Sequence, residues 1–337
     1  MAALGLCLLG CGYIAQRHAQ AARSLRPEVA LSFASRDPGR AEAYRRAFRG
    51  VAAFPDYEAA VRDPRVHAVL ICTPHHLHAA HAALAFRHGK HVLVEKPIAS
   101  SLEDADAMIA GARGAGMILM VAENFWFMPA MVAARRLIQE GRLGAVSQIQ
   151  LVARGYRVPS PWRCRRAEAG GGALIDGGIH YVNLLRQCGG EVVEVYALRP
   201  PQTIAEMEGE DSVYLLARLR SGAVAALINS VGTPGVLRTQ CSSVSGPEGT
   251  LLLDNRGRFL LLRARRAPRL LIFLRDRRGH GAMLREFVAA VREGRQPATT
   301  GEEGRRDLAV VLAAYRSLAL GRPVELSAPD PRPGGFT

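Results

Sequence analysis

This sequence has only two lysines, and its other basic residues, histidines aside, are all arginines. Of 44 lysines and arginines in 337 residues, only Lys90 and Lys96 are lysines. Arginine stays protonated near neutral pH, whereas a partly desolvated lysine can lose its proton and take part in proton transfer. Lys96 lies between Glu95 and Pro97, directly after the apolar run 91–94. We therefore interpret Lys96 as a candidate acid, base or oxyanion partner; the alternative is an ordinary surface lysine.

A second candidate for proton chemistry is the pair Asp176 and His180. The two residues are four positions apart in a segment, 170–188, that we expect to be one helix opened by three glycines. On a helix such residues share a face, about 6 Å apart. Histidine is the usual acid or base near neutral pH, and a carboxylate one turn away can orient it. The glycines predict a close approach of the backbone to a ligand. A purely structural Asp–His pair is the alternative.

The glycines near the start of the chain have the spacing of a dinucleotide-binding turn. The apolar run 4–9 precedes them and a helical pattern over 16–25 follows, with Ala15 at the third position of the fingerprint. Such glycines allow a tight turn and let the backbone approach a pyrophosphate at the helix N-terminus. A glycine turn without a ligand is the alternative. The predicted cofactor contacts here are Gly10, Gly12, Tyr13 and Ile14.

The end of the second predicted strand indicates which nicotinamide cofactor binds. An NAD site would have an acidic residue there for the ribose hydroxyls, whereas this strand ends in Ser35 and Arg36. A serine next to an arginine suits a 2′-phosphate. Asp37 could serve NAD, but its place before Pro38 is explained by helix capping. We therefore favour NADP(H), with NAD(H) as the possible alternative.

Four histidines follow the fourth predicted strand and could be read as a zinc site. Against metal, the segment has no nearby carboxylate or Cys-x-x-Cys, and the adjacent His75 and His76 cannot both ligate comfortably. We expect no metal, and instead a loop that crosses beside the cofactor. For His76 and His81 the alternative is that they are ordinary residues at the start of a helix, without a role in binding. With the neighbouring strand end, the predicted cofactor contacts are Thr73, Pro74, His75, His78, Glu95 and Lys96.

Alternating strands and helices position these residues. An α/β pattern to residue 122 predicts a doubly wound parallel sheet, whose strands' carboxyl ends form the ligand crevice. We therefore expect a dinucleotide-binding Rossmann domain over 1–122. The predicted strands are 4–9, 29–35, 51–53, 66–72, 91–94 and 117–121.

After residue 122 the pattern changes. Strands follow one another from 192 to 274 without intervening helices, which predicts a large, mostly antiparallel sheet with one open face. We expect an α+β domain over 123–327 for substrate binding and oligomerisation, with helices near 283–293 and 304–320. Residues 328–337 read as a flexible tail rich in proline and glycine.

Composition excludes several other classes of protein. Apolar residues make up 49% and charged residues 22%, as in ordinary globular proteins, and no apolar run is long enough to span a bilayer. The net charge of +14 would permit nucleic-acid binding, but the densest basic run, 262–278, has a single aromatic residue. The six cysteines form no Cys-x-x-Cys. We expect a cytoplasmic protein that binds neither nucleic acid nor membrane.

Taken together, these motifs resemble the glucose–fructose oxidoreductase/inositol dehydrogenase/rhizopine catabolism (Gfo/Idh/MocA) family over essentially the full length. The Glu-Lys-Pro element and the Asp-x-Gly-x-His element are the most specific. The matching segments are the fingerprint at 10–15, Thr73-Pro74 with His78, 89–97, 122–125, Trp162-Arg163 and 170–180.

The resemblance implies an NAD(P)-dependent oxidoreductase of sugars, cyclitols or their derivatives. It places Lys96, Asp176 and His180 at catalytic positions, and Asn124, Trp162 and Arg163 near the cofactor. It also implies a cis bond before Pro97, and a homodimer or homotetramer built on the open sheet face. The apolar segment 125–128 departs from many relatives and leaves the substrate's polarity open.

The resulting hypothesis is hydride transfer between NADP(H), or NAD(H), and a carbinol or ketone carbon of a sugar, cyclitol or related polyol. His180 exchanges the proton, Lys96 stabilises the alkoxide and Asp176 orients His180; the reverse division between Lys96 and His180 is the alternative. The other candidates are a reductase of a nucleotide-linked keto-sugar or of a less polar ketone, dihydrodiol or imine, and a catalytically silent NADP-binding regulator.

Overall fold

The computed structural model describes residues 2–233, 240–264 and 268–326. The chain forms two compact units. Unit 1 comprises Met1–Pro129, Pro161–Gly170 and Arg275–Arg305, and unit 2 comprises Ala130–Ser160, Gly171–Leu274 and Arg306–Thr337. The predicted tail at 328–337 lies outside the described residues. None of the described helices is long and apolar enough to cross a membrane.

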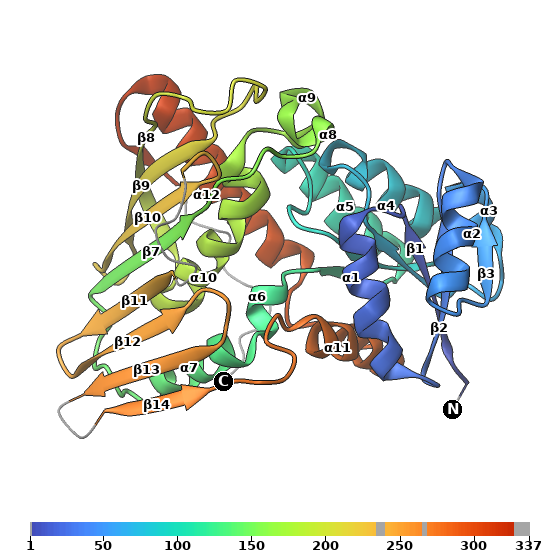
Figure 1. Ribbon diagram of the computed structural model, residues 1–337, viewed down its shortest axis with the longest axis horizontal. Helices are drawn as coiled ribbons and strands as arrows, with labels where there is room; N and C mark the ends of the chain where they lie inside the picture. The colour runs from blue at the N-terminus through green and yellow to red at the C-terminus, as the bar shows by residue number, and fades with distance from the viewer. Residues whose placement is uncertain (1, 234–239, 265–267, 327–337) are drawn as a thin grey trace. The chain divides into compact units, whose positions relative to one another are not determined.

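Unit 1 contains a six-stranded parallel sheet, which confirms the doubly wound prediction (Figure 1). Its order, β3-β2-β1-β4-β5-β6, is that of a dinucleotide-binding fold. Because all strands run the same way, the segments after them gather at one edge, which we call the carboxyl edge. The strands are β1 (Leu4–Leu9), β2 (Val29–Ala34), β3 (Ala52–Phe54), β4 (Ala68–Ile71), β5 (His91–Val94) and β6 (Leu119–Val121).

Helices cover both faces of this sheet. One face packs on the helices α1 (Tyr13–Ala22) and α11 (His280–Glu293), whose buried apolar side chains share a core with β1, β2 and β4. On the other side, α4 packs on β4 and β5, and α5 packs on α4 and β6. The remaining helices of unit 1 are α2 (Pro38–Ala47), α3 (Tyr57–Arg62), α4 (His78–Arg87), α5 (Leu102–Ala115), α6 (Asn124–Phe127), α8 (Pro161–Cys164) and α9 (Arg166–Ala169), with short 3-10 turns η1 (Arg23–Leu25) and η2 (His75–Leu77).

Unit 2 is built on a nine-stranded sheet of order β14-β13-β12-β11-β7-β10-β9-β8-β15. Among the described strands of this sheet only β7 and β10 pair in parallel, so the sheet is mostly antiparallel, as predicted. The strands are β7 (Gln148–Arg154), β8 (Val192–Leu198), β9 (Ser212–Leu219), β10 (Val224–Ser230), β11 (Cys241–Gly246), β12 (Gly249–Asp254), β13 (Phe259–Ala264), β14 (Arg269–Ile272) and β15 (Val324–Glu325).

One face of this second sheet carries helices and the other carries exposed apolar side chains. Helix α10 (Ile179–Gly189) packs on β7 and β10 (Figure 1). The hydroxyl of Ser317 in α12 (Gly301–Leu320) accepts a backbone N–H of β8. Along β9 the burial alternates, with Tyr214 and Leu216 exposed on the face that no described helix covers. Helix α7 (Pro129–Gln139) precedes β7, and the turn η3 (Leu174–Gly178) precedes α10.

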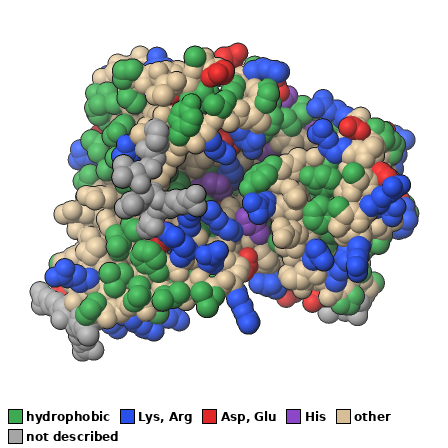
Figure 2. Space-filling model, in the orientation of Figure 1, with side chains coloured by type: hydrophobic (Ala, Val, Ile, Leu, Met, Phe, Trp, Pro, Cys, Tyr) green, Lys and Arg blue, Asp and Glu red, His purple; other side chains and the backbone are tan. Residues whose placement is uncertain are grey.

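The two units are interleaved along the chain. Helices α8, α9 and α11 belong to unit 1 although they follow residue 122. Helix α11 joins unit 1 because its apolar face packs against α1, a contact that sequence order does not indicate. The split into domains at 1–122 and 123–327 stays a prediction. On the face in Figure 2, basic side chains are spread among hydrophobic and acidic ones.

Candidate cofactor and active site

The glycine turn after β1 has room for a phosphate group. Gly10 has φ of +98°, and a Cβ there would approach the Cys72 carbonyl oxygen at 3.1 Å. At Gly12, apart from its chain neighbours, no described atom lies within 4 Å of the Cβ position, and this residue begins α1 without a described side-chain cap. The start of α1 thus has space beside Gly12 and no described side-chain cap, which fits a pyrophosphate. Tyr13 is exposed beside this turn and Ile14 is partly buried.

The end of β2 presents a cation and a capped helix. Asp37 Oδ1 accepts the Arg40 N–H at 3.1 Å, which confirms its predicted capping role for α2. Ser35 is buried, and its hydroxyl accepts the Asp37 N–H at 3.2 Å. Burial raises the pKa of Tyr57, and the charge of the exposed Arg36 opposes that rise. Arg36 and Tyr57 thus lie together at the carboxyl edge.

The loop after β4 is fixed by its own histidines. Thr73 Oγ1 lies 2.9 Å from His81 Nδ1, and burial lowers the pKa of His81 to about 4, so this ring is neutral near pH 7. The His78 ring is fully buried, with Nδ1 2.9 Å from the Pro97 carbonyl oxygen and Nε2 3.0 Å from that of Thr73. His78 therefore joins the backbone of this loop to the segment after β5. Pro74 directly precedes the turn η2.

The structure brings His75 and Trp162 together, although 87 positions separate them in the sequence. Their rings meet edge to face with centroids 4.9 Å apart, and His75 Nδ1 lies 2.8 Å from the Ala169 carbonyl oxygen. The Arg163 guanidinium lies over the Trp162 ring at 4.2 Å. The predicted cofactor residues Trp162 and Arg163 thus lie in unit 1, beside the loop that follows β4.

Glu95, Lys96 and Pro97 follow β5 at the same edge. Glu95 Oε1 lies 2.5 Å from His18 Nε2, and Oε2 accepts the Lys96 N–H at 3.2 Å. Burial pushes the pKa of Glu95 up, but the bond to His18 and the charge of Lys96 outweigh it and lower the pKa to about 2. The peptide bond between Lys96 and Pro97 is cis, as the family resemblance implied. The sequence interpretation missed His18, which carries no local signal for this role.

Asn124 completes the carboxyl edge after β6. Its side-chain amide donates to the Arg278 carbonyl oxygen at 2.7 Å, and the residue is buried. The neighbouring Phe125 and Met128 are buried as well, and Phe127 packs against the core of unit 1. The apolar character of this segment is therefore explained by packing.

Asp176 and His180 lie in unit 2, on the helix expected after the glycines. Residues Leu174–Gly178 form a π-helical turn and α10 continues from Ile179 to Gly189, so the helix is confirmed, but its start is wider than an α-helix. The buried Asp176 carboxylate lies 3.3 Å from the Arg157 guanidinium, another residue that the sequence interpretation missed. Because Lys96 belongs to unit 1, its convergence with His180 stays a prediction.

The glycines before Asp176 are needed by the protein itself. A Cβ at Gly171 would overlap the Tyr315 ring, and a Cβ at Gly172 would overlap the Glu210 backbone. The glycines were predicted to let the backbone approach a ligand closely. At Gly171 and Gly172 the groups that approach the backbone are instead Tyr315 and Glu210 of the protein. Neither residue belongs to a motif, although Glu210 precedes β9 in a short polar turn.

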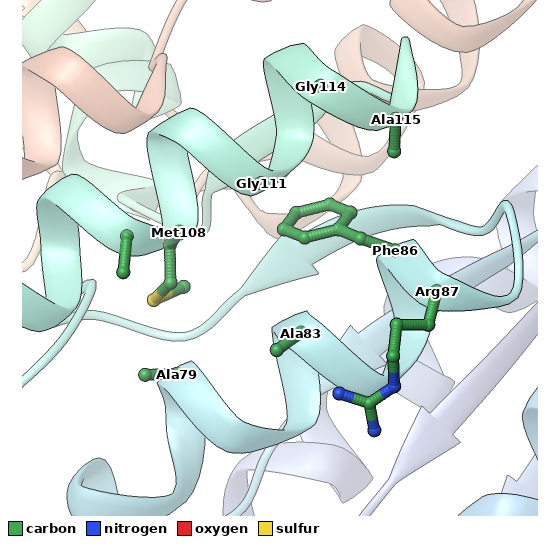
Figure 3. A pocket seen from close by; sticks show the side chains of 9 residues that line it. Ala79, Ala83, Phe86, Arg87, Met108, Gly111, Gly114 and Ala115 are labelled. Carbon is green, nitrogen blue, oxygen red and sulfur yellow. The ribbon is translucent and has the colours of Figure 1, made fainter.

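A cavity of about 370 Å³ lies between α4 and α5 in unit 1 (Figure 3). Its described lining has no acidic residue and no histidine, so it offers little for proton transfer. The described residues also contain no group of three or more histidine, cysteine or acidic side chains suited to a metal ion. The cavity is lined by Ala79, Ala83, Phe86, Arg87, Ala107, Met108, Gly111, Gly114 and Ala115.

Comparison with protein families identifies both parts of the chain. Residues 4–123 match the profile of the Gfo/Idh/MocA oxidoreductase family with an NAD-binding Rossmann fold. Residues 131–252 match the profile of a Gfo/Idh/MocA C-terminal domain.

Individual relatives agree with these matches. A 1,5-anhydro-D-fructose reductase of Ensifer adhaerens is 32% identical over 80% of this chain and 82% of its own length. An inositol 2-dehydrogenase of Rhizobium meliloti is 29% identical over 95% of this chain and 98% of its own. The solved structure of an aldose-aldose oxidoreductase from Caulobacter crescentus, complexed with glycerol, is 29% identical with a TM-score of 0.88, covering 96% of this chain and all of that one.

Proposed function

The chain belongs to the Gfo/Idh/MocA family of oxidoreductases, and from that premise we propose that it interconverts a carbinol and a ketone of a sugar, cyclitol or related polyol. The observation that carries the proposal is the Glu95-Lys96-Pro97 segment, which follows β5 at the carboxyl edge of a nucleotide-binding sheet. The apolar segment 125–128 had left the polarity of the substrate open. Because Phe125 and Met128 are buried in the protein, this segment gives no reason to expect an apolar substrate, which supports a polar one.

In the proposed mechanism, the nicotinamide, when bound, donates or accepts the hydride. His180 exchanges a proton with the substrate oxygen, and Asp176 orients its ring. Lys96 stabilises the negative charge that develops on that oxygen. Glu95 is occupied by His18 and by the Lys96 N–H, which supports a role in holding Lys96.

For the cofactor, we propose a preference for NADP(H) over NAD(H). Its support is the end of β2, where Arg36 is an exposed cation and the Asp37 carboxylate caps α2. A guanidinium can pair with a 2′-phosphate, whereas a carboxylate engaged in capping is less suited to the ribose hydroxyls. The predicted contacts from Gly10 to Arg163 would hold the cofactor along the carboxyl edge.

We also propose a cytoplasmic homo-oligomer. All six cysteines are free in the structure, which is typical of a reducing compartment. The uncovered face of the second sheet exposes Leu198, Tyr214, Leu216 and Val224, which we call the outer-sheet patch. Such a patch is commonly covered by a partner, here a second copy of the chain.

Turnover assays test the proposed function. We would measure reduction of 1,5-anhydro-D-fructose with NADPH and with NADH, and oxidation of myo-inositol and D-glucose with NADP⁺ and with NAD⁺. We expect turnover in this panel and a higher kcat/KM with the phosphorylated cofactor. The panel also contains a nucleotide-linked keto-sugar with NADPH; turnover of this compound alone would support the alternative substrate class. Binding of cofactor without any turnover would contradict the proposal.

The variant Lys96→Arg tests the mechanism. Because arginine does not release its proton, we expect kcat to fall by about 10²–10⁴ while the NADPH dissociation constant changes by less than about threefold. The matched control is Lys90→Arg, because Lys90 Nζ donates to the carbonyls of Asp63 and Val66 at 3.2 and 2.6 Å, before β4. The control should keep its turnover. Near-normal turnover of Lys96→Arg would remove Lys96 from the mechanism.

A further inference from the structure

Two residues from distant parts of unit 2 hold the start of the helix that carries Asp176. The N–H groups of Gly172 and Ile175 donate to the Tyr315 hydroxyl at 3.1 and 3.2 Å. Between them, the Ala173 N–H donates to the Glu210 carbonyl oxygen at 2.7 Å and the Leu174 N–H to the Glu210 carboxylate at 2.9 Å. Four consecutive donors at a helix start, which otherwise lack partners, are thus satisfied by Glu210 and Tyr315.

The two residues also bind each other. The Tyr315 hydroxyl donates to Glu210 Oε1 at 3.0 Å. Burial, and then the charge of Glu210, raises the pKa of Tyr315 well above its usual range, so the hydroxyl keeps the proton it donates. A carboxylate at a helix N-terminus is also stabilised by the helix dipole. The pair is therefore a closed hydrogen-bonded unit, which we call the Glu210–Tyr315 bracket.

Close packing leaves the bracket little freedom. A Cβ at Gly171 would overlap Tyr315, one at Gly172 would overlap Glu210, and one at Gly209 would overlap the Gly172 backbone. Three glycines thus let the bracket approach the backbone directly. The π-helical turn that contains Asp176 begins at once after this point, at Leu174.

We propose that Glu210 and Tyr315 are positioning residues for the reaction, because they fix the backbone that places Asp176 and, through it, His180. The inference rests on the proposed function, in which Asp176 and His180 act on the substrate proton. The proposal assigns neither bracket residue a contact with the substrate. The bracket satisfies the donors of the first turn and so sets where the wide π turn begins. Loss of the bracket leaves the side chains present but poorly placed, and small displacements of reacting groups lower turnover strongly.

The test is Tyr315→Phe, which keeps the ring and its burial but removes the acceptor of two N–H groups. We expect kcat on the best substrate of the panel to fall about 10–100-fold, as for groups displaced by about 1 Å, with the KM for NADPH changed by less than about twofold. Glu210→Gln, which keeps the size but removes the charge, should act in the same direction.

The matched control is Ser317→Ala on the same helix. Ser317 is fully buried; its hydroxyl accepts the Ala197 N–H at 3.0 Å and donates to the Arg322 carbonyl oxygen at 2.7 Å. This variant loses a comparable number of buried hydrogen bonds away from Asp176. It should lower the melting temperature and leave kcat unchanged. Equal losses of kcat in Ser317→Ala and Tyr315→Phe would mean a merely structural role and overturn the inference.

Hydrogen exchange without substrate gives a second readout. Amide exchange in the peptide 170–180 should rise at least about tenfold in Tyr315→Phe and stay unchanged in Ser317→Ala, because each lost bond frees an N–H. Unchanged exchange in Tyr315→Phe would contradict the bracket. If amide exchange rises in Tyr315→Phe but Lys96→Arg keeps its turnover, the proposed mechanism fails and the bracket stands. If Lys96→Arg abolishes turnover but Tyr315→Phe does not lower it, the inference about the bracket fails and the proposed mechanism stands.

Discussion

At the scale of single residues, the carboxylate of Glu95 shows how a motif residue can serve its neighbours. Both its oxygens are engaged inside unit 1, one by His18 and one by the Lys96 N–H. The His280 ring lies edge-on to that of His18, with centroids 5.4 Å apart. A buried charge is stable only with such partners, so Glu95 ties the segment after β5 to helix α1.

This burial predicts a pH dependence of stability. The pKa of Glu95 is lowered from 4.5 to about 2, so its contribution is present above pH 4.5 and is lost as the pH falls towards 2. A shift of this size corresponds to on the order of 3 kcal/mol. In urea unfolding, Glu95→Gln should have a lower free energy of unfolding than the wild-type protein at pH 6. Between pH 6 and pH 2, the free energy of unfolding should also fall less in the variant than in the wild-type protein.

Glu42 offers the matched control for this measurement. Its pKa is also lowered to about 2, by hydrogen bonds from Arg45 and then Arg46, but its side chain lies at the surface and is 34% exposed. Exposed ion pairs add little to stability and are screened by salt. Glu42→Gln should therefore change the pH dependence little. An equal effect of both variants would show that burial of Glu95 is unimportant.

At the scale of elements, the glycines around Asp176 have opposite requirements within one segment. Gly172 approaches the Glu210 backbone too closely for any side chain, whereas at Gly177 no described atom outside its own turn and chain neighbours lies within 4 Å of the Cβ position. The first glycine serves the bracket, and the second leaves space beside the π turn.

The contrast predicts two different alanine variants. Gly172→Ala should destabilise the protein by about 3 kcal/mol or more, because backbone atoms of Glu210 cannot rotate away as a side chain can. Gly177→Ala should be neutral or stabilising by up to about 1 kcal/mol, because alanine favours helix over glycine. Thermal unfolding of both variants checks this. Similar melting temperatures of the two variants would show that the loop before β9, which contains Glu210, can move to accommodate a methyl group.

At the scale of the whole molecule, the proposed assembly rests on the outer-sheet patch of unit 2. Leu198 pairs with Tyr214 across β8 and β9, and Leu216 lies two residues further on the same face. All three are about half exposed, with relative exposures of 55%, 48% and 53%. Contiguous apolar side chains on a sheet face favour association.

The proposed assembly predicts the effect of Leu216→Glu. A charge at the centre of the outer-sheet patch would be desolvated in the interface, so light scattering after size exclusion should show a shift from oligomer to monomer. The control is Val51→Glu in unit 1, where an equally exposed apolar residue, 59%, lies outside the patch. A monomeric wild-type protein, or a variant that stays oligomeric, would contradict assembly through this face.

Much of the architecture could be predicted from local pattern. Apolar runs after glycine and proline signals located all six strands of the first sheet, with ends that differ by up to two residues. Their alternation with helices predicted the parallel sheet, because parallel strands need a crossover between them. The residues after each strand were therefore expected at one edge, where the structure has Gly10, Arg36, Thr73 and Lys96.

The partners of these residues could not be predicted in the same way. His18 is 77 positions from Glu95, and Tyr315 is more than 130 positions from the glycines it contacts. The π turn also has the same local pattern as an ordinary helix start, so only its packing against Glu210 distinguishes it.

By itself, the sequence determined the parallel sheet, its glycine turn and the motif residues at its edge, because these depend on periodicity and on residues close together in the chain. Only the tertiary structure decided which groups hold those residues. In the folded chain, Trp162 contacts the His75 ring and Glu95 bonds to His18. Glu210 and Tyr315 accept the N–H groups at the start of the helix that carries Asp176. Such contacts join distant segments, and their energy comes from burial, which exists only once the chain has folded.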